Sequence, residues 1–286
     1  MPELPEVETI RRDLSRVLRG RSISRVELRK DTMVDGPAGL FASRLKSGEI
    51  RDIDRRGKLL IFHFANDDDL HLLIHLKMTG QLVYEHADKL LGGGHGFPIV
   101  NKLPNDYSHI IFSFHGGGRL FFNDARQFGF ARLVDTETLE RTLAGFGVEP
   151  LSAVFTPEVL QNIRRRRQAS LKSVLLNQQL IAGLGNIYVD EVCFAAGVRP
   201  MRRAGKVTAA ECQRLHRAIV DVLTAALAAR GTTFGNYRDG LGGEGKFVRQ
   251  LKVYGRGGQE CKQCGRRLQK VVVSQRGTVY CPVCQK

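Results

Sequence analysis

Four cysteines in the last 26 residues of the chain have the spacing of metal ligands. Two residues separate Cys261 from Cys264 and Cys281 from Cys284, and 16 residues lie between the two pairs. Each pair offers two thiolates from one tight turn, and two such turns complete a tetrahedron around Zn²⁺. All four positions would then be filled by protein, so we predict one structural zinc ion with no open site for an activated water. One alternative is four unrelated thiols. The other is two disulfides, and disulfides are disfavoured in a cytosolic protein.

The segment between the cysteine pairs contains "QRGTVY", which a zinc ribbon would display on a hairpin. Arg276 at such a tip is either a solvated charge or a clamp for a phosphate. The basic charge of this part of the chain favours the clamp.

The N-terminal stretch "MPELPEVETI" is unusual in a chain with a net charge of +15. Pro5 suits the first position of a helix, and Glu6 and Glu8 would face the positive end of the helix dipole. This interpretation accounts for Pro5 but not for Pro2 and Glu3, which lie so close to the terminus.

Residues 177–191, "NQQLIAGLGNIYVDE", predict a helical hairpin with glycines at the turn. Gly183 and Gly185 let the backbone approach a ligand closely, and exposed amides at the start of the next helix bind phosphate. Asn186 opens that helix and could also serve as its N-cap. A DNA-binding helix–turn–helix module and an ordinary helical hairpin both fit this stretch.

The positive charge is confined to the second half of the chain. Residues 1–150 hold 21 basic and 21 acidic residues, whereas residues 151–286 hold 23 basic and 8 acidic ones, so 23 − 8 = +15 lies there. This asymmetry, with a pI near 9.9, predicts that the second half docks on a polyanion, with nucleic acid the first candidate. An anionic membrane surface is the alternative, but no polybasic amphipathic helix supports it.

Composition and hydropathy place the chain among soluble globular proteins. The 286 residues are 42% hydrophobic and 26% charged, which suffices for two domains and a sizeable core. No apolar run approaches the roughly 20 residues of a membrane span, and the N-terminus lacks the layout of a signal peptide. We therefore expect a cytoplasmic protein with no membrane partner.

The residue pattern of the first half of the chain predicts one helix followed by many strands. Apolar residues recur at helical spacing over 5–19, and Gly20 supplies a stop. Short β-rich runs then follow, which predict an antiparallel sandwich. They occupy residues 22–29, 48–56, 58–65, 69–78, 108–114, 119–125 and 128–134. The glycine- and proline-containing stretch 90–105 has no clear period, and we predict a mobile loop there.

The second half predicts helices and then the cysteine-rich tail. Helices are expected over 155–163, 171–180 and 186–197, and the longest begins at a capping box formed by Thr208 and Glu211 and stops at Gly231. The expected domains are a helix and β-sandwich domain (1–134), a linker (135–156), a helical domain (157–250) and a zinc finger (251–286). The helical domain includes a glycine-rich segment, 232–247.

Several motifs in order along the chain resemble the formamidopyrimidine-DNA glycosylase family of base-excision repair enzymes. They are "MPELPEVET", "RRGKLLIF", "HLKMTG", "NDARQFGF", "GLGNIYVDE", "VYGRGG" and the terminal four-cysteine pattern. The resemblance covers essentially the whole chain. It implies a multidomain α+β fold with an N-terminal helix and antiparallel β-sandwich, a helix–two-turns–helix motif and a four-cysteine zinc finger. It also implies that residues 232–247 cover an extruded base.

The resemblance implies a nucleophile at the N-terminus. Removal of Met1 would make Pro2 the terminal residue, and its secondary amine would attack C1′ of a damaged nucleotide. An α-amino group titrates near 8, so part of it is uncharged at neutral pH. The resulting iminium acidifies the C2′ protons, and strand cleavage by elimination needs no further cofactor. Glu3 would shuttle protons, with Glu6 in support.

The resemblance also assigns residues to DNA contact. Lys58 matches a family lysine near the lesion. Three further residues match the family's wedge, the side chains that fill the space left by the extruded base: Met78, Arg126 and Phe128. Phosphates flanking the flipped nucleotide would be held by His75, Asn186 and Arg276. On spacing alone, Met78 and Phe128 would be assigned to the core and Lys58 to a solvated strand. Cys193 and Cys212 are expected to be buried thiols.

The implied enzyme is a monomeric, bacterial-type glycosylase and apurinic/apyrimidinic lyase for oxidised purines in double-stranded DNA, associated with the nucleoid. The alternatives are an endonuclease VIII-like glycosylase for oxidised pyrimidines and a non-catalytic damage-binding protein. "PELPEVE" favours the purine branch, and the presence of Pro2 and Glu3 argues against a pure binder. The wedge loop "DARQF" departs from many relatives, which have proline after the aspartate and a second arginine, so the opposite-base preference stays open.

Overall fold

The computed structural model describes residues 1–87, 89–94, 103–232 and 245–286. The chain forms two compact units. Unit 1 comprises residues 1–144 and 229–246, and unit 2 comprises residues 145–228 and 247–286.

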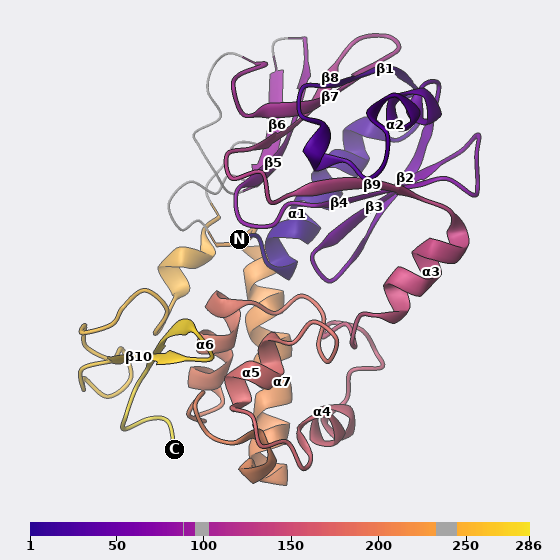
Figure 1. Cartoon of the computed structure of the whole chain (residues 1–286). Helices are drawn as coiled ribbons and strands as arrows, with labels where there is room; N and C mark the ends of the chain where they lie inside the picture. Colours follow the sequence, from indigo (N-terminus) through magenta and orange to yellow (C-terminus); the bar gives the residue numbers. More distant parts are fainter. Residues whose placement is uncertain (88, 95–102, 233–244) are drawn as a thin grey trace. The chain divides into compact units, whose positions relative to one another are not determined.

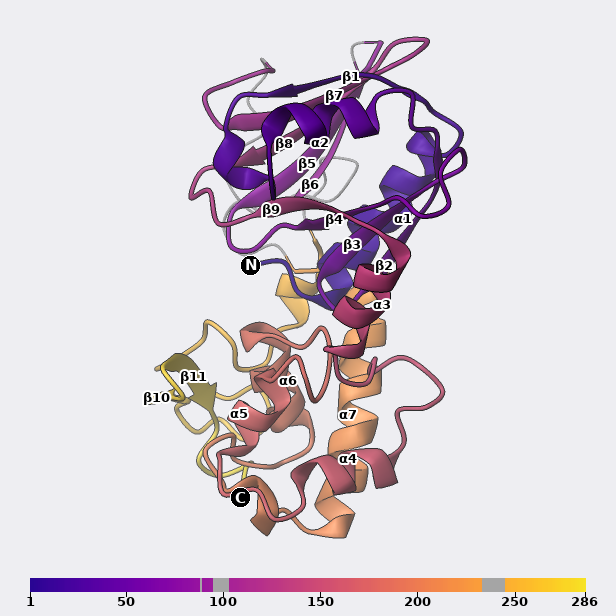
Figure 2. The ribbon, with the colours of Figure 1, turned by 45° about the vertical axis from the view of Figure 1, so that its right-hand side comes forward.

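Unit 1 is an antiparallel β-sandwich, as the strand pattern predicted (Figures 1 and 2). One sheet has five strands in the order β1-β7-β8-β5-β6, and the other has four in the order β2-β3-β4-β9. The strands of the first sheet are β1 (Ile23–Leu28), β5 (Gly80–His86), β6 (Lys89–Gly94), β7 (Ser108–Phe114) and β8 (Arg119–Asp124). Those of the second are β2 (Ile50–Arg56), β3 (Leu59–Phe64), β4 (His71–His75) and β9 (Phe130–Val134).

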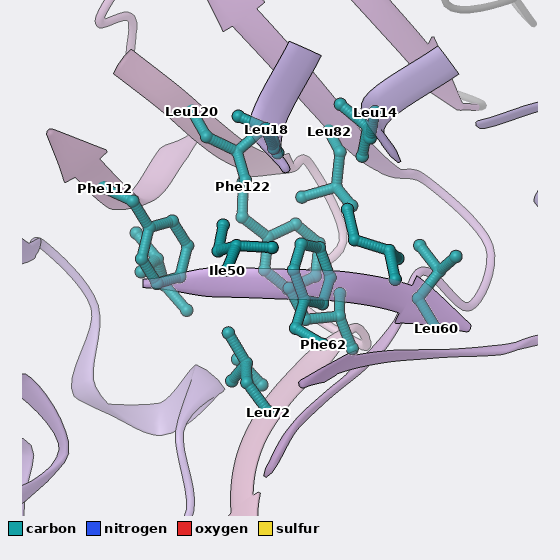
Figure 3. Close-up of a cluster of buried hydrophobic side chains, with 14 of the residues drawn as sticks. Leu14, Leu18, Ile50, Leu60, Phe62, Leu72, Leu82, Phe112, Leu120 and Phe122 are labelled. Atoms are coloured by element: carbon teal, nitrogen blue, oxygen red, sulfur yellow. The ribbon is translucent and has the colours of Figure 1, made fainter. Parts of the chain in front are cut away.

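The two sheets and the first helix share one hydrophobic core. Phe62 from the four-stranded sheet lies among Leu82 and Phe122 from the five-stranded sheet, and Leu14 of the helix reaches the same cluster (Figure 3). All four side chains are at most 1% exposed. Burial of such large apolar side chains supplies most of the stability of the sandwich, at roughly 1.5–3 kcal/mol each.

Unit 1 also contains helices among its described residues. The predicted helix over 5–19 is confirmed as α1 (Leu4–Leu18), and Gly20 after it has a φ of +76°. Two further helices, which the sequence did not predict, are α2 (Ala38–Leu45) and α3 (Thr136–Ala144). A short 3-10 helix, η1, spans Asp31–Met33.

The predicted loop at 90–105 is wrong for its first residues, which belong to strand β6. Gly92, Gly93 and Gly94 pair with Val83, Leu82 and Gln81 of β5, a strand that was also not predicted. A Cβ atom on Gly94 would lie 2.3 Å from the Gly80 carbonyl oxygen, so the glycine permits close approach of two strands rather than a flexible loop. Residues 95–102 lie outside the described part of the chain.

Unit 2 begins with helices. They are α4 (Pro157–Arg164), α5 (Leu171–Leu176), α6 (Asn186–Ala195) and α7 (Ala209–Ala228), with the 3-10 helices η2 (Ala204–Lys206) and η3 (Phe247–Gln250). The capping box before α7 is present: Glu211 N–H donates to Thr208 Oγ1 at 3.2 Å, and Thr208 N–H donates to Glu211 Oε2 at 2.7 Å. Helix α5 ends four residues before the predicted position, because Leu180 and Ile181 N–H groups donate to Asn177 O in a turn.

The tail of unit 2 is a two-stranded antiparallel hairpin, β10 (Gln269–Val273) and β11 (Arg276–Tyr280). Its turn residues Ser274 and Gln275 have positive φ values of 52° and 59°, the twist that two-residue hairpin turns favour. Within the described residues, no helix combines the length and apolarity that crossing a bilayer requires.

Candidate functional site

The chain becomes buried directly after the exposed Met1, at the start of α1. Pro2 is buried, and the Glu3 side chain is only 3% exposed. Glu3 occupies the N-cap position and forms a capping box with Glu6, whose carboxylate accepts the Glu3 N–H at 2.9 Å. The sequence predicted the helix start near Pro5, whereas the box shows that Glu3 and Glu6 also fix the chain that enters the helix.

Glu6 also ties the N-terminus to a distant part of the sequence. Its Oε1 accepts the backbone N–H of Thr232 at 2.7 Å, and both residues are at most 1% exposed. Gly231 is required beside it, since a Cβ there would lie 2.8 Å from Glu6 Oε1 and the φ of Gly231 is +85°. Glu6 thus anchors the chain that leads into 233–244, the part of the predicted 232–247 segment outside the described residues.

The terminal amine is electrostatically tuned toward its neutral form. The pKa of the Met1 α-amino group lies below its ordinary value of 8.0, first because burial disfavours the charged form. The carboxylates of Glu3 and Glu6 oppose this shift, and the Lys58 ammonium adds to it. Lys58 is 5% exposed, so it is not the solvated strand charge that spacing alone suggested.

His75, at the end of β4, is held as a neutral imidazole. Burial lowers its pKa to about 3, and the nearby ammonium groups of Lys77 and Lys58 act in the same direction. Its Nδ1 accepts the Lys77 N–H at 2.9 Å, which assigns the proton to Nε2. His75 therefore offers one N–H donor without a positive charge, and Lys58 lies within electrostatic reach of both this ring and the terminal amine.

The predicted wedge residues are exposed. Met78 is 38% exposed and Phe128 is 54% exposed, so neither is a core residue. The Arg126 guanidinium carbon lies 4.7 Å from the centre of the Phe128 ring, a cation–π contact that stiffens both side chains. The loop before β9 thus displays an aromatic and a cationic side chain together.

Asp124 holds this loop beside Met78, and the sequence alone did not reveal that role. Its side chain is fully buried, Oδ2 accepts the Gly129 N–H at 2.7 Å, and Oδ1 accepts the Arg126 N–H at 3.2 Å. Oδ1 also accepts the hydroxyl of Thr79, the residue that follows Met78. One carboxylate therefore joins the two segments that carry the wedge residues.

In unit 2, the structure brings Asn186 and Arg276 to the same hairpin. Asn186 is the first residue of α6, and Gly185, not Asn186, is its N-cap, so the alternative N-cap role is wrong. The Asn186 side chain instead donates from Nδ2 to the Gly277 carbonyl at 3.1 Å. Arg276, the residue before Gly277, begins β11 and is exposed.

The four cysteines of the tail converge as their spacing predicted. The Sγ atoms of Cys261, Cys264, Cys281 and Cys284 all lie within 4.8 Å of one another. The Cys261–Cys284 and Cys264–Cys281 Sγ distances are 4.0 and 3.5 Å. Four soft sulfur ligands around one point suit a tetrahedral zinc ion. Cys193 and Cys212 are buried away from this cluster, as expected.

The sequence also missed three buried charged residues of unit 2. Lys172 and Asp190 are fully buried and form an ion pair at 2.7 Å, and Glu191 is 4% exposed. The Glu191 carboxylate accepts the backbone N–H groups of residues 252–254 at 2.8–2.9 Å. The available signal was the pair of acids in the otherwise apolar stretch 186–195, where a charge is retained only with a partner.

Comparison with protein families gives matches along most of the chain. The family model for the formamidopyrimidine-DNA glycosylase N-terminal domain matches residues 1–131, and that for the formamidopyrimidine-DNA glycosylase H2TH domain matches residues 146–237. The zinc finger found in FPG and IleRS matches residues 258–286, which include all four clustered cysteines.

Curated and solved relatives agree with these matches. The formamidopyrimidine-DNA glycosylase of Symbiobacterium thermophilum is 43% identical over 288 residues, covering 100% of this chain and 89% of the relative. Two Lactococcus lactis Fpg structures align with TM-scores of 0.89. One is a mutant in complex with Fapy-dG-containing DNA (33% identity, 100% of both chains), and the other is bound to abasic-site DNA (34% identity, 99% of both chains). The chain belongs to the formamidopyrimidine-DNA glycosylase family.

Proposed function

We propose that this protein excises oxidised purines, including 8-oxoguanine and formamidopyrimidines, from duplex DNA and then cleaves the strand at the resulting site. Family membership supports DNA glycosylase chemistry. The observation that carries the finer proposal is the burial of Pro2 next to two buried carboxyl groups, those of Glu3 and Glu6, with the buried Lys58 within electrostatic reach of the Met1 amine.

Removal of Met1 converts the tertiary amide nitrogen of Pro2 into a secondary amine at this buried place. The neutral amine attacks C1′ of the damaged nucleotide, and the glycosidic bond breaks as the base leaves with a proton. Loss of the proton from the amine and opening of the sugar ring give an iminium ion between Pro2 and C1′. Glu3, the adjacent buried carboxyl group, supplies the proton to the ring oxygen.

The iminium then drives strand cleavage. It withdraws electrons from C2′, whose proton is removed by a base, and the 3′ phosphate leaves in a β-elimination. A second elimination releases the 5′ phosphate. Each step transfers a proton and an electron pair already present in the adduct, so the Pro2 amine and nearby acid–base groups suffice for it.

DNA is the proposed partner, since the aligned Lactococcus lactis structures contain lesion-bearing DNA. Lys58, His75, Asn186 and Arg276 are the proposed phosphate and lesion-flanking contacts. His75 would donate from neutral Nε2, which needs no acidic pH. Met78, Arg126 and Phe128 would fill the space of the extruded base, and their exposure makes them available for it.

The four clustered cysteines at positions 261, 264, 281 and 284 would hold one zinc ion, which fixes the tail around a tetrahedral centre.

We also propose that the protein is a monomer, and sedimentation of the purified protein tests this directly.

Borohydride trapping on an 8-oxoguanine:cytosine duplex tests the catalytic proposal. Reduction of the iminium should link the mature protein covalently to DNA, and Pro2→Gly should lose most of this adduct. Glu3→Gln should slow excision by about 10²–10⁴-fold, the usual contribution of a positioned acid–base group. Glu27→Gln is the matched control, because Glu27 lies exposed on β1.

Two results would contradict the proposal. A mature wild-type protein that forms no adduct is not the proposed lyase. Faster trapping on a thymine-glycol duplex than on the 8-oxoguanine duplex would instead assign the protein to the oxidised-pyrimidine branch.

A further inference from the structure

A fully buried ion pair in unit 2 has no part in the chemistry described above. Lys172 of α5 and Asp190 of α6 are each 0% exposed, and Lys172 Nζ donates to Asp190 Oδ1 at 2.7 Å. Burying two charges carries a large desolvation penalty, and an apolar pair of the same volume is often equally stable. Stability alone therefore does not explain why two charges stand here.

Both members of the pair also form a hydrogen bond to the same strand, β11. Lys172 Nζ donates to the Gly277 carbonyl at 3.2 Å, and Asp190 Oδ2 accepts the Val279 N–H at 2.9 Å. The two contacts lie on either side of Thr278, which is fully buried. The two contacts therefore fix the position of β11 along its own length relative to α5 and α6.

The same strand carries Arg276, one proposed phosphate contact of unit 2, and accepts a hydrogen bond from Asn186, the other one. Asn186 Nδ2 shares the Gly277 carbonyl with Lys172 Nζ, and Arg276 is the preceding residue. Asn186 and Asp190 are four residues apart on α6, so they lie on one face of the helix, and both side chains contact β11. The Gly277 carbonyl is the point where the two groups meet.

The tip of the hairpin has a second attachment to α5. The hydroxyl of Ser274 lies 3.2 Å from that of Ser170, the N-cap of α5, and also bonds the hydroxyl of Ser173. Ser274 and Gln275 hold positive φ values without being glycine, a conformation that persists where surrounding contacts enforce it. The Arg276 backbone is thus fixed from both sides.

We infer that the Lys172–Asp190 pair is a positioning device that holds the Arg276–Gly277 backbone and the Asn186 amide in one geometry for a DNA phosphate. The inference rests on the proposed function, because it takes Arg276 and Asn186 to be the phosphate contacts. Lys172 and Asp190 act through these residues and do not touch DNA themselves.

The test measures binding to a duplex that carries a tetrahydrofuran abasic analogue opposite cytosine. Asp190→Asn keeps the shape of the side chain, and Lys172→Met removes the charged donor. Each should weaken binding by about tenfold, the effect of one lost hydrogen bond to a charged group. Each should also reduce the slope of log Kd against log salt by about 0.9, the value for one phosphate contact.

A double-mutant cycle separates positioning from general damage. In an Asn186→Ala/Arg276→Ala background, Asp190→Asn should weaken binding by no more than about twofold, because residues that act through the same contacts are not additive. Ile219→Val, a buried change in α7, is the control, and its effect should be the same in both backgrounds. Zinc content and the melting temperature are measured on every variant.

The outcomes are distinct. If Asp190→Asn leaves the affinity unchanged at full zinc content, or weakens it equally with and without the Asn186 and Arg276 side chains, the inference is overturned. If Lys172→Met fails to fold, Asp190→Asn decides alone, and the steady-state profile provides a second measurement: KM should rise while kcat stays within about twofold. If the wild-type protein binds neither abasic nor 8-oxoguanine duplexes, the proposed function itself fails.

Discussion

At the scale of single residues, the candidate site depends on groups whose charge is set by burial. The terminal amine and His75 both have pKa values below their ordinary range, and for both the first cause is loss of water around the charged form. A neutral amine is a nucleophile, and a neutral imidazole donates one hydrogen bond. The family resemblance pointed to both positions but gave no information about their protonation.

The lowered pKa of His75 predicts how the stability of the folded protein depends on pH. Its folded pKa of about 3 lies below the ordinary value of 6.5, so the unfolded chain binds more protons between these two values. Stability from His75 is therefore present above pH 6.5 and is lost as the pH falls toward 3. Between pH 7 and pH 5, the wild type should lose about 1–2 kcal/mol more stability than His75→Gln.

Urea unfolding of both proteins at the two pH values measures this difference, and titrations common to both proteins cancel. An equal loss in wild type and His75→Gln would show that the imidazole of His75 protonates as readily in the folded protein as in the unfolded chain.

At the scale of elements, turns and loops carry the side chains while buried acids determine where these segments lie. Asp124 joins the loop of Arg126 and Phe128 to Thr79, as Glu6 joins α1 to Thr232. In both cases a short-range motif was readable from the sequence, whereas the partner lay more than 40 residues away. The pairing of β5 with β6 is a similar case, since its glycines predicted a loop.

Two substitutions in the wedge loop should separate an effect on excision from an effect on stability. Phe128→Ala should alter stability by less than about 0.5 kcal/mol, because the side chain is exposed. It should slow single-turnover excision by about tenfold, since stacking on an exposed base contributes about 1–3 kcal/mol. Asp124→Ala should slow excision and also lower stability by about 1–3 kcal/mol, because three donors lose their buried acceptor.

Leu40→Ala provides the control, because Leu40 is a 57% exposed apolar residue of α2 outside the wedge. It should change neither quantity. Excision by Phe128→Ala at the wild-type rate would remove Phe128 from the proposed wedge.

At the scale of the whole molecule, each unit has its own source of stability. Unit 1 has a large apolar core between two sheets. The tail of unit 2 packs around a small apolar cluster. It includes Phe194 of α6, Val253 and Leu268, together with Cys261, Cys281 and Cys284. A core of that size supports little structure without a metal ion.

Zinc removal should therefore act on the tail and leave the sandwich folded. A chelator, or Cys264→Ala, should remove one zinc ion per chain and weaken DNA binding at least about tenfold, because Arg276 lies on the hairpin that the metal organises. Cys212→Ala, at a buried thiol outside the cluster, should keep the zinc and the affinity. Colorimetric zinc release and anisotropy measure the two quantities. Unchanged affinity after complete zinc loss would refute the structural role of the tail.

The sequence by itself determined the features that depend on local spacing. The four-cysteine cluster, the helix starting near Pro5, the capping box at Thr208 and most strands follow from residue types a few positions apart, and the structure confirms them. The motifs were also sufficient to identify the family. Local signals of this kind survive folding because nearby residues interact in any compact arrangement of the chain.

Only the tertiary structure decided which charged groups are buried and with what partners. Spacing alone suggested that Lys58 is a solvated strand charge, and no sequence signal marked Asp124 or Lys172 as buried, yet all three are at most 5% exposed. Burial of a charge depends on partners far along the chain, such as Asp190 and Gly277 for Lys172. Such partners come together only when the whole unit folds, because the desolvation penalty of each charge is offset only by groups that the fold assembles around it.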